Sequence, residues 1–306
     1  MALPLAFMSM RRRVVTRLRV VGVTDMGEPI VNSKDTRLGG SRRYLIVMFR
    51  PVVSLRTMQL SVPSNKAVVF LSDVHLGLGD RATDRRREDR LLGVLRWAAA
   101  EACHVFIVGD LFDLWFDWRT VIPKGHVRTL AALDDLVAGG VGVTYLMGNH
   151  DFGHYRYFRE ELGIEVDAGD IDLHLGTTRL YVCHGDGKAH NDLGYLVLRS
   201  VLRNPIANWL YRKIHPDWGI GLASSTSKGS RDHTSHKDYG PHDGLRDFAF
   251  ARIDEGYDVV VMGHRHRAAV EHHGRGTYVN LGHWLDERAT YGVFRPNEGL
   301  RLVEVE

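Results

Sequence analysis

Carboxylate, imidazole and carboxamide side chains follow five short apolar stretches of this 306-residue sequence. The five motifs are Asp73-Val74-His75, Gly109-Asp110, Gly148-Asn149-His150-Asp151, His184-Gly185-Asp186 and Gly263-His264-Arg265-His266. Any one of them alone is typical of an ordinary turn, a cap or a surface loop. Five of them directly behind predicted buried strands indicate one shared metal site, because ligands of α/β sheets bind at the carboxyl ends of strands.

The donor chemistry narrows the choice of metal. Carboxylate, imidazole and carboxamide donors without a thiolate suit Mn, Fe, Zn or Ni rather than a soft-metal cluster. Seven such donors are too many for one tetrahedral ion, and they suit two ions about 3.5–4 Å apart that share a carboxylate and a water. Asp110 stands alone at its strand end and is the natural bridge. We expect two divalent ions, Mn²⁺ first, with Fe, Zn or Ni as alternatives.

The elements that must position these motifs alternate between strand and helix, which predicts an α/β fold. Apolar runs predict strands at 67–71, 105–108, 143–147, 180–183 and 259–262, and closing strands at 277–281, 291–294 and 300–306. Helical periodicity predicts helices at 85–101, 126–138, 192–214 (broken at Pro205) and 243–255. The polar motifs therefore gather at one edge of the predicted sheet.

Residues 1–57 differ from the remainder of the chain, since they show no sustained period. Residues 1–60 contain 11 Lys+Arg and 3 Asp+Glu, whereas residues 61–306 contain 29 Lys+Arg and 34 Asp+Glu. The overall net charge of +3 is therefore the sum of a basic N-terminal segment and an acidic remainder of the chain, here called the acidic body. We expect residues 1–57 to be a disordered or non-native basic extension, with Met58 as a possible start, and residues 58–306 to be the catalytic domain. A basic tail that touches membrane or RNA is the alternative reading.

Neither a secretory signal nor a membrane span is indicated. The apolar start of the chain precedes the arginines at 11–13, which is the reverse of the order in a signal peptide. The longest uninterrupted apolar run covers residues 44–49 and is too short to cross a bilayer. The two cysteines, Cys103 and Cys183, are too few for a disulfide framework and indicate a reducing compartment.

In this order the five motifs resemble those of the calcineurin-like metallophosphoesterase superfamily, over about residues 67–283. The resemblance implies a four-layer α/β/β/α sandwich. It assigns Asp73, His75, Asp110 and His266 to a first ion, and Asp110, Asn149, His184 and His264 to a second. It makes His150 a catalytic residue that is not a ligand, oriented by Asp151. A water shared by two ions ionises near neutral pH and attacks phosphorus, while His150 stabilises the developing charge or protonates the leaving oxygen.

Finer features resemble the UDP-2,3-diacylglucosamine diphosphatases, which act in lipid A synthesis of Gram-negative bacteria. They are Ser72-Asp73-Val74-His75-Leu76-Gly77, Gly109-Asp110-Leu111-Phe112-Asp113-Leu114-Trp115 and His184-Gly185-Asp186. This resemblance implies attack on the phosphorus next to uridine, which gives UMP and 2,3-diacylglucosamine 1-phosphate. The best-known members carry Arg where this chain has His150. The chain is therefore either a divergent diphosphatase or a sister phosphoesterase.

The subfamily also has a helical lid that holds the acyl chains, and the insertion at about 190–240 matches its place. Apolar and aromatic residues mix there with arginines, which suits a phosphorylated lipid, although a small satellite core capped by solvated arginines would look the same. Candidate substrate contacts are Asp192, Tyr195, Ser227, Lys228 and Arg231. We expect a nucleotide-linked lipid substrate and a cytoplasmic protein, peripheral on the cytoplasmic face of the inner membrane, without a protein partner.

Two other functions are compatible with parts of the pattern. One is a metallophosphoesterase acting on a nucleotide, a phosphoprotein or nucleic acid. A nuclease would need a basic groove, so the acidic body argues against a specific nucleic-acid partner. The other is a non-catalytic scaffold with the same fold, which would be expected to have lost ligands or His150, and none is lost here.

Overall fold

The computed structural model describes residues 55–188, 204–222 and 244–305, whose strands form two six-stranded sheets. The first sheet has the order β1 (Leu55–Leu60), β6 (Asp170–Leu175), β7 (Thr178–Val182), β8 (Val259–Met262), β10 (Gly276–Asn280), β9 (Ala269–His273). The second has the order β12 (Gly299–Glu304), β11 (Thr290–Arg295), β2 (Ala67–Leu71), β3 (Ala102–Val108), β4 (Gly142–Leu146), β5 (Glu165–Asp167). The helices of the described residues include α1 (Arg81–Glu101), α2 (Val127–Ala138), α3 (Tyr157–Leu162), α5 (Pro205–Tyr211) and α7 (Gly244–Asp254).

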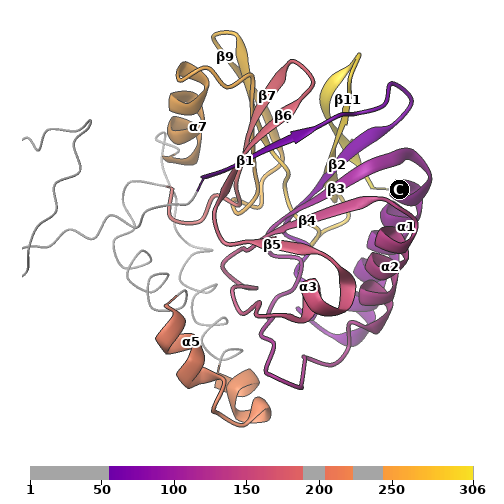
Figure 1. Cartoon of the computed structure of the whole chain (residues 1–306), viewed down its shortest axis with the longest axis vertical. Coiled ribbons are helices and arrows are strands. Elements are labelled where there is room, and N and C mark those ends of the chain that lie inside the picture. Colours follow the sequence, from indigo (N-terminus) through magenta and orange to yellow (C-terminus); the bar gives the residue numbers. More distant parts are fainter. Residues whose placement is uncertain (1–54, 189–203, 223–243, 306) are drawn as a thin grey trace, which may run out of the picture. The chain divides into compact units, whose positions relative to one another are not determined.

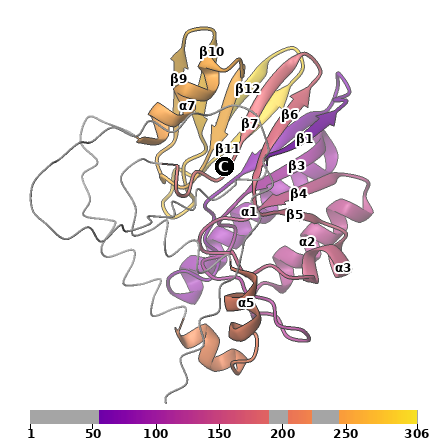
Figure 2. The ribbon, with the colours of Figure 1, turned by 60° about the vertical axis from the view of Figure 1, so that its left-hand side comes forward.

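The two sheets pack face to face, and helices cover their outer faces (Figures 1 and 2). Strand β2 shows how the layers arise, because alternate side chains of a strand point to opposite faces. Val68 and Phe70 join the core between the sheets, whereas Val69 and Leu71 pack on the side of α1, α2 and α3. Helix α7 packs on β8 and β10 of the first sheet. The layer order α/β/β/α confirms the predicted fold class.

The apolar runs of the sequence predict the central elements with small errors at their ends. Helix α1 begins four residues before the predicted start because Asp80 caps it, accepting hydrogen bonds from the backbone of Ala82 and Thr83, both at 2.9 Å. Strand β3 begins three residues earlier than predicted. Helices α2 and α7 and strands β2, β4, β7, β8, β10, β11 and β12 lie within one or two residues of the predicted ranges.

The sequence pattern does not predict β1, β5, β6, β9 or α3. Strand β1 is largely exposed, β5 has three residues and α3 has six, so none of them carries a periodic apolar signal. Strand β1 runs parallel to β6 from Leu55, which pairs with Asp170. The predicted domain boundary at residue 57 therefore falls inside a strand.

Part of the predicted lid lies among the described residues. Helix α5 begins at Pro205, where the predicted helix 192–214 was expected to break, and Asn204 caps it by accepting from the backbone of Ile206 and Ala207. Residues 216–222 are also helical. Over the described parts of the chain, no helix is both long and apolar enough to cross a bilayer.

Truncation of Phe106 tests the core between the sheets. The rings of Phe70 and Phe106 stack with centroids 5.2 Å apart, and both side chains are fully buried. Phe106→Ala is expected to lower the free energy of unfolding by about 3–5 kcal/mol through the lost burial and the cavity left behind. Urea denaturation followed by circular dichroism measures the change. Val127→Ala, at a side chain that is 75% exposed, is the control and should shift stability by less than about 0.5 kcal/mol.

Candidate metal centre

The five polar motifs follow the carboxyl ends of five strands that belong to two sheets. Strands β2, β3 and β4 are parallel neighbours in one sheet, and β7 and β8 are parallel neighbours in the other. Each strand therefore delivers its motif at the same edge, and the packing of the sheets brings the two edges together. The predicted ligands come from both sheets: Asp73 and His75 after β2, Asp110 after β3, Asn149 after β4, His184 after β7, and His264 and His266 after β8.

The backbone at these loops is strained in one characteristic way. Among the described residues, the non-glycine positions with a left-handed backbone are Asp73, His75, Asp110, His264 and His266, with φ between 51° and 65°. Every one of them is a predicted metal ligand. Such a conformation is uncommon for a residue with a Cβ atom, and it clusters at functional sites because the surrounding structure must hold it in place. The strained backbone at these five positions therefore determines the direction of the predicted ligand side chains.

Asp73, His75 and His266 form the first group of ligand atoms. Nε2 of His266 lies 3.2 Å from Oδ1 of Asp73 and 3.0 Å from Nε2 of His75. The second carboxylate oxygen of Asp73 accepts a hydrogen bond from the backbone nitrogen of His264 at 2.8 Å and lies 2.6 Å from Oγ of Ser72. These two contacts fix the carboxylate of Asp73 and leave its Oδ1 available to a metal ion.

Asp110, His184 and His264 form the second group, together with the amide of Asn149. Oδ1 of Asn149 lies 3.1 Å from Nε2 of His184 and 2.9 Å from Nδ1 of His264. The other ring nitrogen of His184, Nδ1, lies 2.8 Å from the carbonyl oxygen of Val108, which orients Nε2 toward the site.

The carboxylate of Asp110 lies between the two groups. Its Oδ1 accepts a hydrogen bond from the backbone nitrogen of His150 at 2.8 Å. Its Oδ2 lies 3.3 Å from Nε2 of His184 and 3.9 Å from Nε2 of His75, one nitrogen from each group. This is the position expected of a bridging ligand.

Two buried oxygen atoms show that the donor set fits divalent ions. Oδ1 of Asp73 and Oδ2 of Asp110 have no hydrogen-bond partner among the described residues, and both side chains are almost fully buried. An unsatisfied buried carboxylate oxygen is costly, and a cation would compensate both atoms. Asp73, His75, Asp110 and His266 could hold one ion, and Asp110, Asn149, His184 and His264 a second.

The charges of the site also suit cations. Burial alone would raise the pKa of Asp73, but the ring nitrogen of His266, 3.2 Å from its Oδ1, and the positive charge of neighbouring histidines lower it to about 2. Burial would lower the pKa of His184, but the carboxylate of Asp110 beside it raises that pKa to about 10. The pKa of Asp110 is likewise held well below its usual range, against the effect of burial, by the neighbouring histidines. Two ionised carboxylates beside imidazoles favour a bound cation.

Two glycines allow the loops to approach so closely. A Cβ atom on Gly148 would lie 2.0 Å from Oδ1 of Asp110, and one on Gly263 would lie 2.2 Å from Oδ2 of Asp73. No side chain can be accommodated at either distance without displacing a ligand. The glycines that precede Asn149 and His264 are therefore steric requirements of the metal centre.

Comparison with known proteins agrees with this geometry. Residues 66–268 match the family model of the calcineurin-like phosphoesterases. The chain belongs to the calcineurin-like phosphoesterase family. It is therefore a member of a family of metal-dependent hydrolases, and the paired ligand groups provide the site that such an enzyme needs.

Curated relatives within the family share one name, UDP-2,3-diacylglucosamine hydrolase. The protein from Porphyromonas gingivalis is 32% identical over 65% of this chain and 82% of its own length. That from Nitrosococcus oceani is 30% identical over 71% of this chain and 87% of its own. That from Vibrio vulnificus is 27% identical over 74% of this chain and 93% of its own.

His150 lies beside the predicted ligands of the phosphoesterase site, and Asp113 lies next to its ring. Its ring packs edge-on against His75 with centroids 4.9 Å apart. Nδ1 of His150 lies 3.0 Å from the backbone oxygen of Asp113 and 3.5 Å from the Asp113 carboxylate. The same carboxylate lies 3.8 Å from Nδ1 of His75. Asp113 thus faces both histidines. It is not among the site residues predicted from the sequence, and the only sequence signal for it is its position three residues after Asp110.

Asp151, expected to orient His150, is hydrogen-bonded to the neighbouring loops. Its Oδ2 accepts hydrogen bonds from the backbone nitrogen of Leu111 and the hydroxyl of Tyr145, and its Oδ1 accepts one from the backbone nitrogen of Gly148. Burial, together with the nearby charge of Asp110, raises the pKa of Asp151 to about 6. Its side chain thus supports the backbone of the loops after β3 and β4, and its role in orienting His150 stays a prediction.

The five predicted substrate contacts, Asp192, Tyr195, Ser227, Lys228 and Arg231, lie outside the described residues.

Asp113→Asn tests the role of Asp113 in positioning His150. The amide keeps the shape of the side chain but loses the negative charge near the two imidazoles. We expect kcat for phosphodiester hydrolysis to fall about 10–100-fold, as for other residues that orient a catalytic or metal-binding histidine, with little change in KM. Steady-state kinetics with bis-p-nitrophenyl phosphate provide the measurement. Asp135→Asn, an exposed carboxylate on α2, is the matched control, and equal rates in both variants would contradict the assignment.

Proposed function

We propose that this phosphoesterase hydrolyses UDP-2,3-diacylglucosamine to UMP and 2,3-diacylglucosamine 1-phosphate. The observation that carries the proposal is the match to relatives named UDP-2,3-diacylglucosamine hydrolase, which spans 82–93% of the length of the three relatives described above. The paired ligand groups on either side of Asp110 support it, because a diphosphate needs positive charge at the attacked phosphorus.

In the proposed mechanism, an activated water attacks phosphorus, and His150 acts on the phosphorus centre or the leaving oxygen. Two divalent ions, Mn²⁺ in this proposal, would lower the pKa of a shared water and neutralise charge on the phosphate oxygens. In this proposal the water loses a proton to solvent, its oxygen bonds to the phosphorus next to uridine, and the bond from that phosphorus to the bridging oxygen breaks. 2,3-Diacylglucosamine 1-phosphate leaves with the bridging oxygen. His150, held by Asp113, stabilises the crowded phosphorus centre or donates a proton at the leaving oxygen.

Residues 204–222, which we propose to be part of a lid, contact the loops after β3 and β4. Nε of Arg212 donates a hydrogen bond to the backbone oxygen of Asp117 at 3.2 Å, and its guanidinium lies over the rings of Phe116 and Tyr155, 4.9 and 4.3 Å from their centroids. Nε1 of Trp118 donates to the backbone oxygen of Ile214 at 3.2 Å. The anchoring residues directly follow Asp113 and the 149–151 motif. We propose that the lid lies over the leaving-group side of the substrate.

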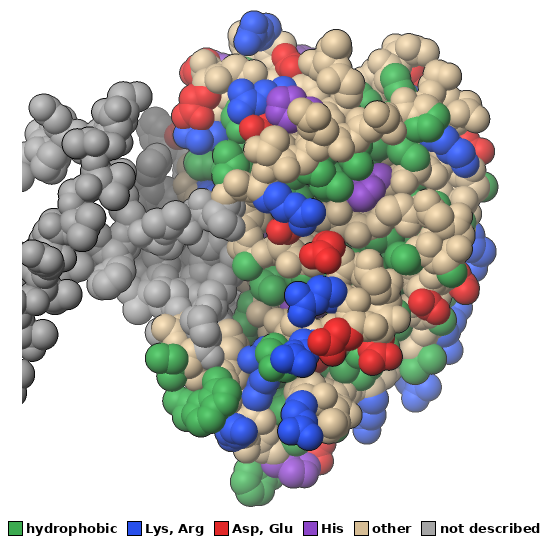
Figure 3. Space-filling model, viewed as in Figure 1, with side chains coloured by type: hydrophobic (Ala, Val, Ile, Leu, Met, Phe, Trp, Pro, Cys, Tyr) green, Lys and Arg blue, Asp and Glu red, His purple; other side chains and the backbone are tan. Residues whose placement is uncertain are grey.

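The same segment exposes apolar side chains, and Figure 3 shows green hydrophobic side chains gathered at the place of α5. Its exposed side chains are Ile206, Trp209, Leu210, Trp218 and Leu222, each between 56% and 76% exposed. Patches of this kind mark surfaces that bind apolar partners, and tryptophan favours the interface of a bilayer. In this proposal they receive the acyl chains and rest on the membrane, so that the protein is peripheral on the cytoplasmic face of the inner membrane.

Release of UMP from UDP-2,3-diacylglucosamine is the direct test. The full chain with Mn²⁺ should release UMP and the lipid 1-phosphate, both detectable by mass spectrometry. His150→Ala should still bind Mn²⁺ but hydrolyse the substrate about 10²–10⁴-fold more slowly, since it loses proton transfer or charge stabilisation. Hydrolysis of bis-p-nitrophenyl phosphate without any UMP release would reject the lipid substrate while leaving the phosphoesterase assignment intact.

A second experiment tests the membrane surface. Trp209→Ser together with Trp218→Ser removes two exposed rings, each of which should contribute about 1.5–3 kcal/mol when buried in a bilayer. Co-sedimentation with phosphatidylglycerol vesicles should therefore weaken at least about tenfold. Val127→Ser, at an equally exposed apolar side chain on α2, should bind vesicles as the unaltered chain does. Undiminished sedimentation of the double variant would contradict this part of the proposal.

A further inference from the structure

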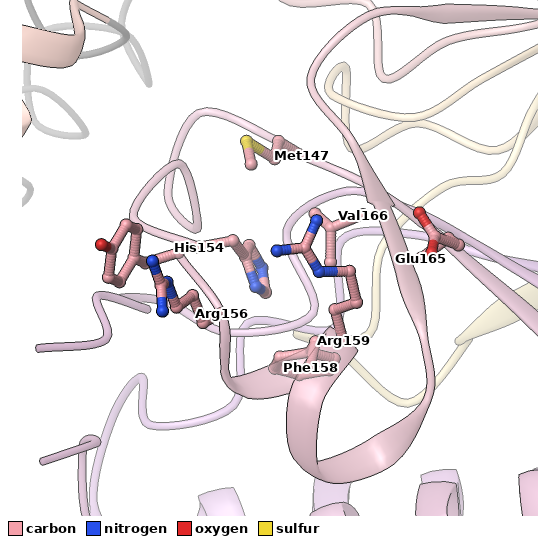
Figure 4. A pocket seen from close by; sticks show the side chains of 8 residues that line it. Met147, His154, Arg156, Phe158, Arg159, Glu165 and Val166 are labelled. Atoms are coloured by element: carbon pink, nitrogen blue, oxygen red, sulfur yellow. The ribbon is translucent and has the colours of Figure 1, made fainter. Parts of the chain in front are cut away.

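A small pocket lies beside α3, away from the predicted metal ligands. It is lined by residues from the end of β4, from the segment 154–159 and from β5, and its volume is about 80 Å³. Figure 4 shows the lining side chains, which include Met147, His154, Arg156 and Arg159. None of the predicted metal ligands or catalytic residues lines it, so the metal chemistry does not explain it.

His154 forms the buried part of the pocket. Only 9% of the residue is exposed, and neither ring nitrogen has a hydrogen-bond partner among the described residues. Its ring packs between aromatic neighbours, with centroids 4.5 Å from Tyr145, 4.7 Å from Phe158 and 5.8 Å from Trp115. Burial lowers the pKa of His154 to about 3, so the ring is neutral at physiological pH. One nitrogen then donates and the other accepts, and leaving both unsatisfied costs free energy.

Two arginines, Arg156 and Arg159, lie at the rim of the pocket, and they differ in their partners. Arg156 lies 3.5 Å from the carboxylate of Glu160 and 5.0 Å from the ring centroid of Tyr155. Arg159 makes no ion pair among the described residues. In Figure 4 the ring of His154 and the guanidinium of Arg159 point toward one another, with Met147 above them, while Glu165 lies on the other side of the β5 ribbon. The pocket thus presents the guanidinium of Arg159, with the buried imidazole of His154 beside it.

We propose that this pocket binds a small oxyanion, a phosphate or a carboxylate group. A guanidinium matches the oxygen pairs of such groups, and the neutral imidazole supplies a further donor at the bottom of the pocket. The volume accommodates one such group with few additional atoms. This inference does not rest on the lipid substrate, because it concerns a different part of the surface and a different set of residues.

The pocket is connected to the predicted metal centre through two side chains, Tyr145 and Asp151. The ring of His154 packs against that of Tyr145, whose hydroxyl donates to Asp151. Asp151 in turn accepts hydrogen bonds from the backbone of Leu111 and Gly148, the neighbours of Asp110 and Asn149. An anion beside His154 would therefore be linked through these two side chains to the loops that carry two predicted metal ligands.

Calorimetric titration of the full, Mn²⁺-loaded chain with inorganic phosphate tests the proposal. Because a dinuclear centre also binds phosphate, the titration is repeated with Asp110→Asn, which disables that centre. In the Asp110→Asn background we expect one millimolar phosphate site, whose affinity falls at least about tenfold when Arg159→Gln or His154→Phe is added, whereas the unaltered chain shows phosphate binding at the metal centre in addition. His154→Phe keeps the aromatic packing but removes both nitrogens. Arg96→Gln, which makes the same charge change on an exposed part of α1, should bind as before.

Two results of these titrations would overturn the proposed anion site. Absence of phosphate and acetate binding in the Asp110→Asn background would overturn the proposal, as would binding that survives both pocket substitutions. Arg159→Gln changes an exposed side chain, so its result remains interpretable if His154→Phe fails to fold. A parallel titration with acetate identifies the ligand class: tighter binding of phosphate supports a phosphoryl ligand, and tighter binding of acetate supports a carboxylate.

Discussion

A buried, ionised carboxylate between two groups of imidazoles is the constraint on which the rest of the structure depends. Asp110 is 1% exposed, and its Oδ2 lies within 4 Å of a histidine from each sheet, His75 and His184. A buried charge without compensation would destabilise the fold by several kcal/mol. The two sheets must therefore pack so that the carboxyl ends of β3 and β7 meet, and divalent ions are the compensation that the donor set suits.

The rigidity of the sandwich allows the strained loops to persist. Each left-handed ligand residue costs on the order of 1–3 kcal/mol, and five of them surround the centre. The apolar core between the sheets, which includes Phe70 and Phe106, holds the strands that enter these loops. The loops are also fastened to one another: the backbone nitrogen of Trp115 donates to the oxygen of His150, and Gly153 and Trp115 are hydrogen-bonded in turn. The fold itself thus holds the predicted ligands in place.

The sequence alone predicts the layers and the ligand groups but not the finer contacts of the site. Buried strands such as β2 and β3 are short apolar runs followed by polar motifs, and this pattern can be recognised in the sequence alone. Edge strands such as β1 and β9 lack it because their side chains face water. The roles of Asp113 and Asp151 could not be separated, since both are aspartates near His150 and the direction of a side chain in a loop depends on tertiary contacts. His154 shows no sequence signal at all, because its meaning comes from the pocket around it.

The contacts of residues 204–222 have a consequence for how this enzyme can be altered. Arg212 lies against Phe116 and Tyr155 and bonds to Asp117, residues that belong to the loops after β3 and β4, the second of which carries His150. A segment taken from a relative in place of residues 204–222 would need matching residues at 115–118 and 152–156 to make these contacts. Exchange of this segment is accordingly expected to require coordinated exchange of the two loops.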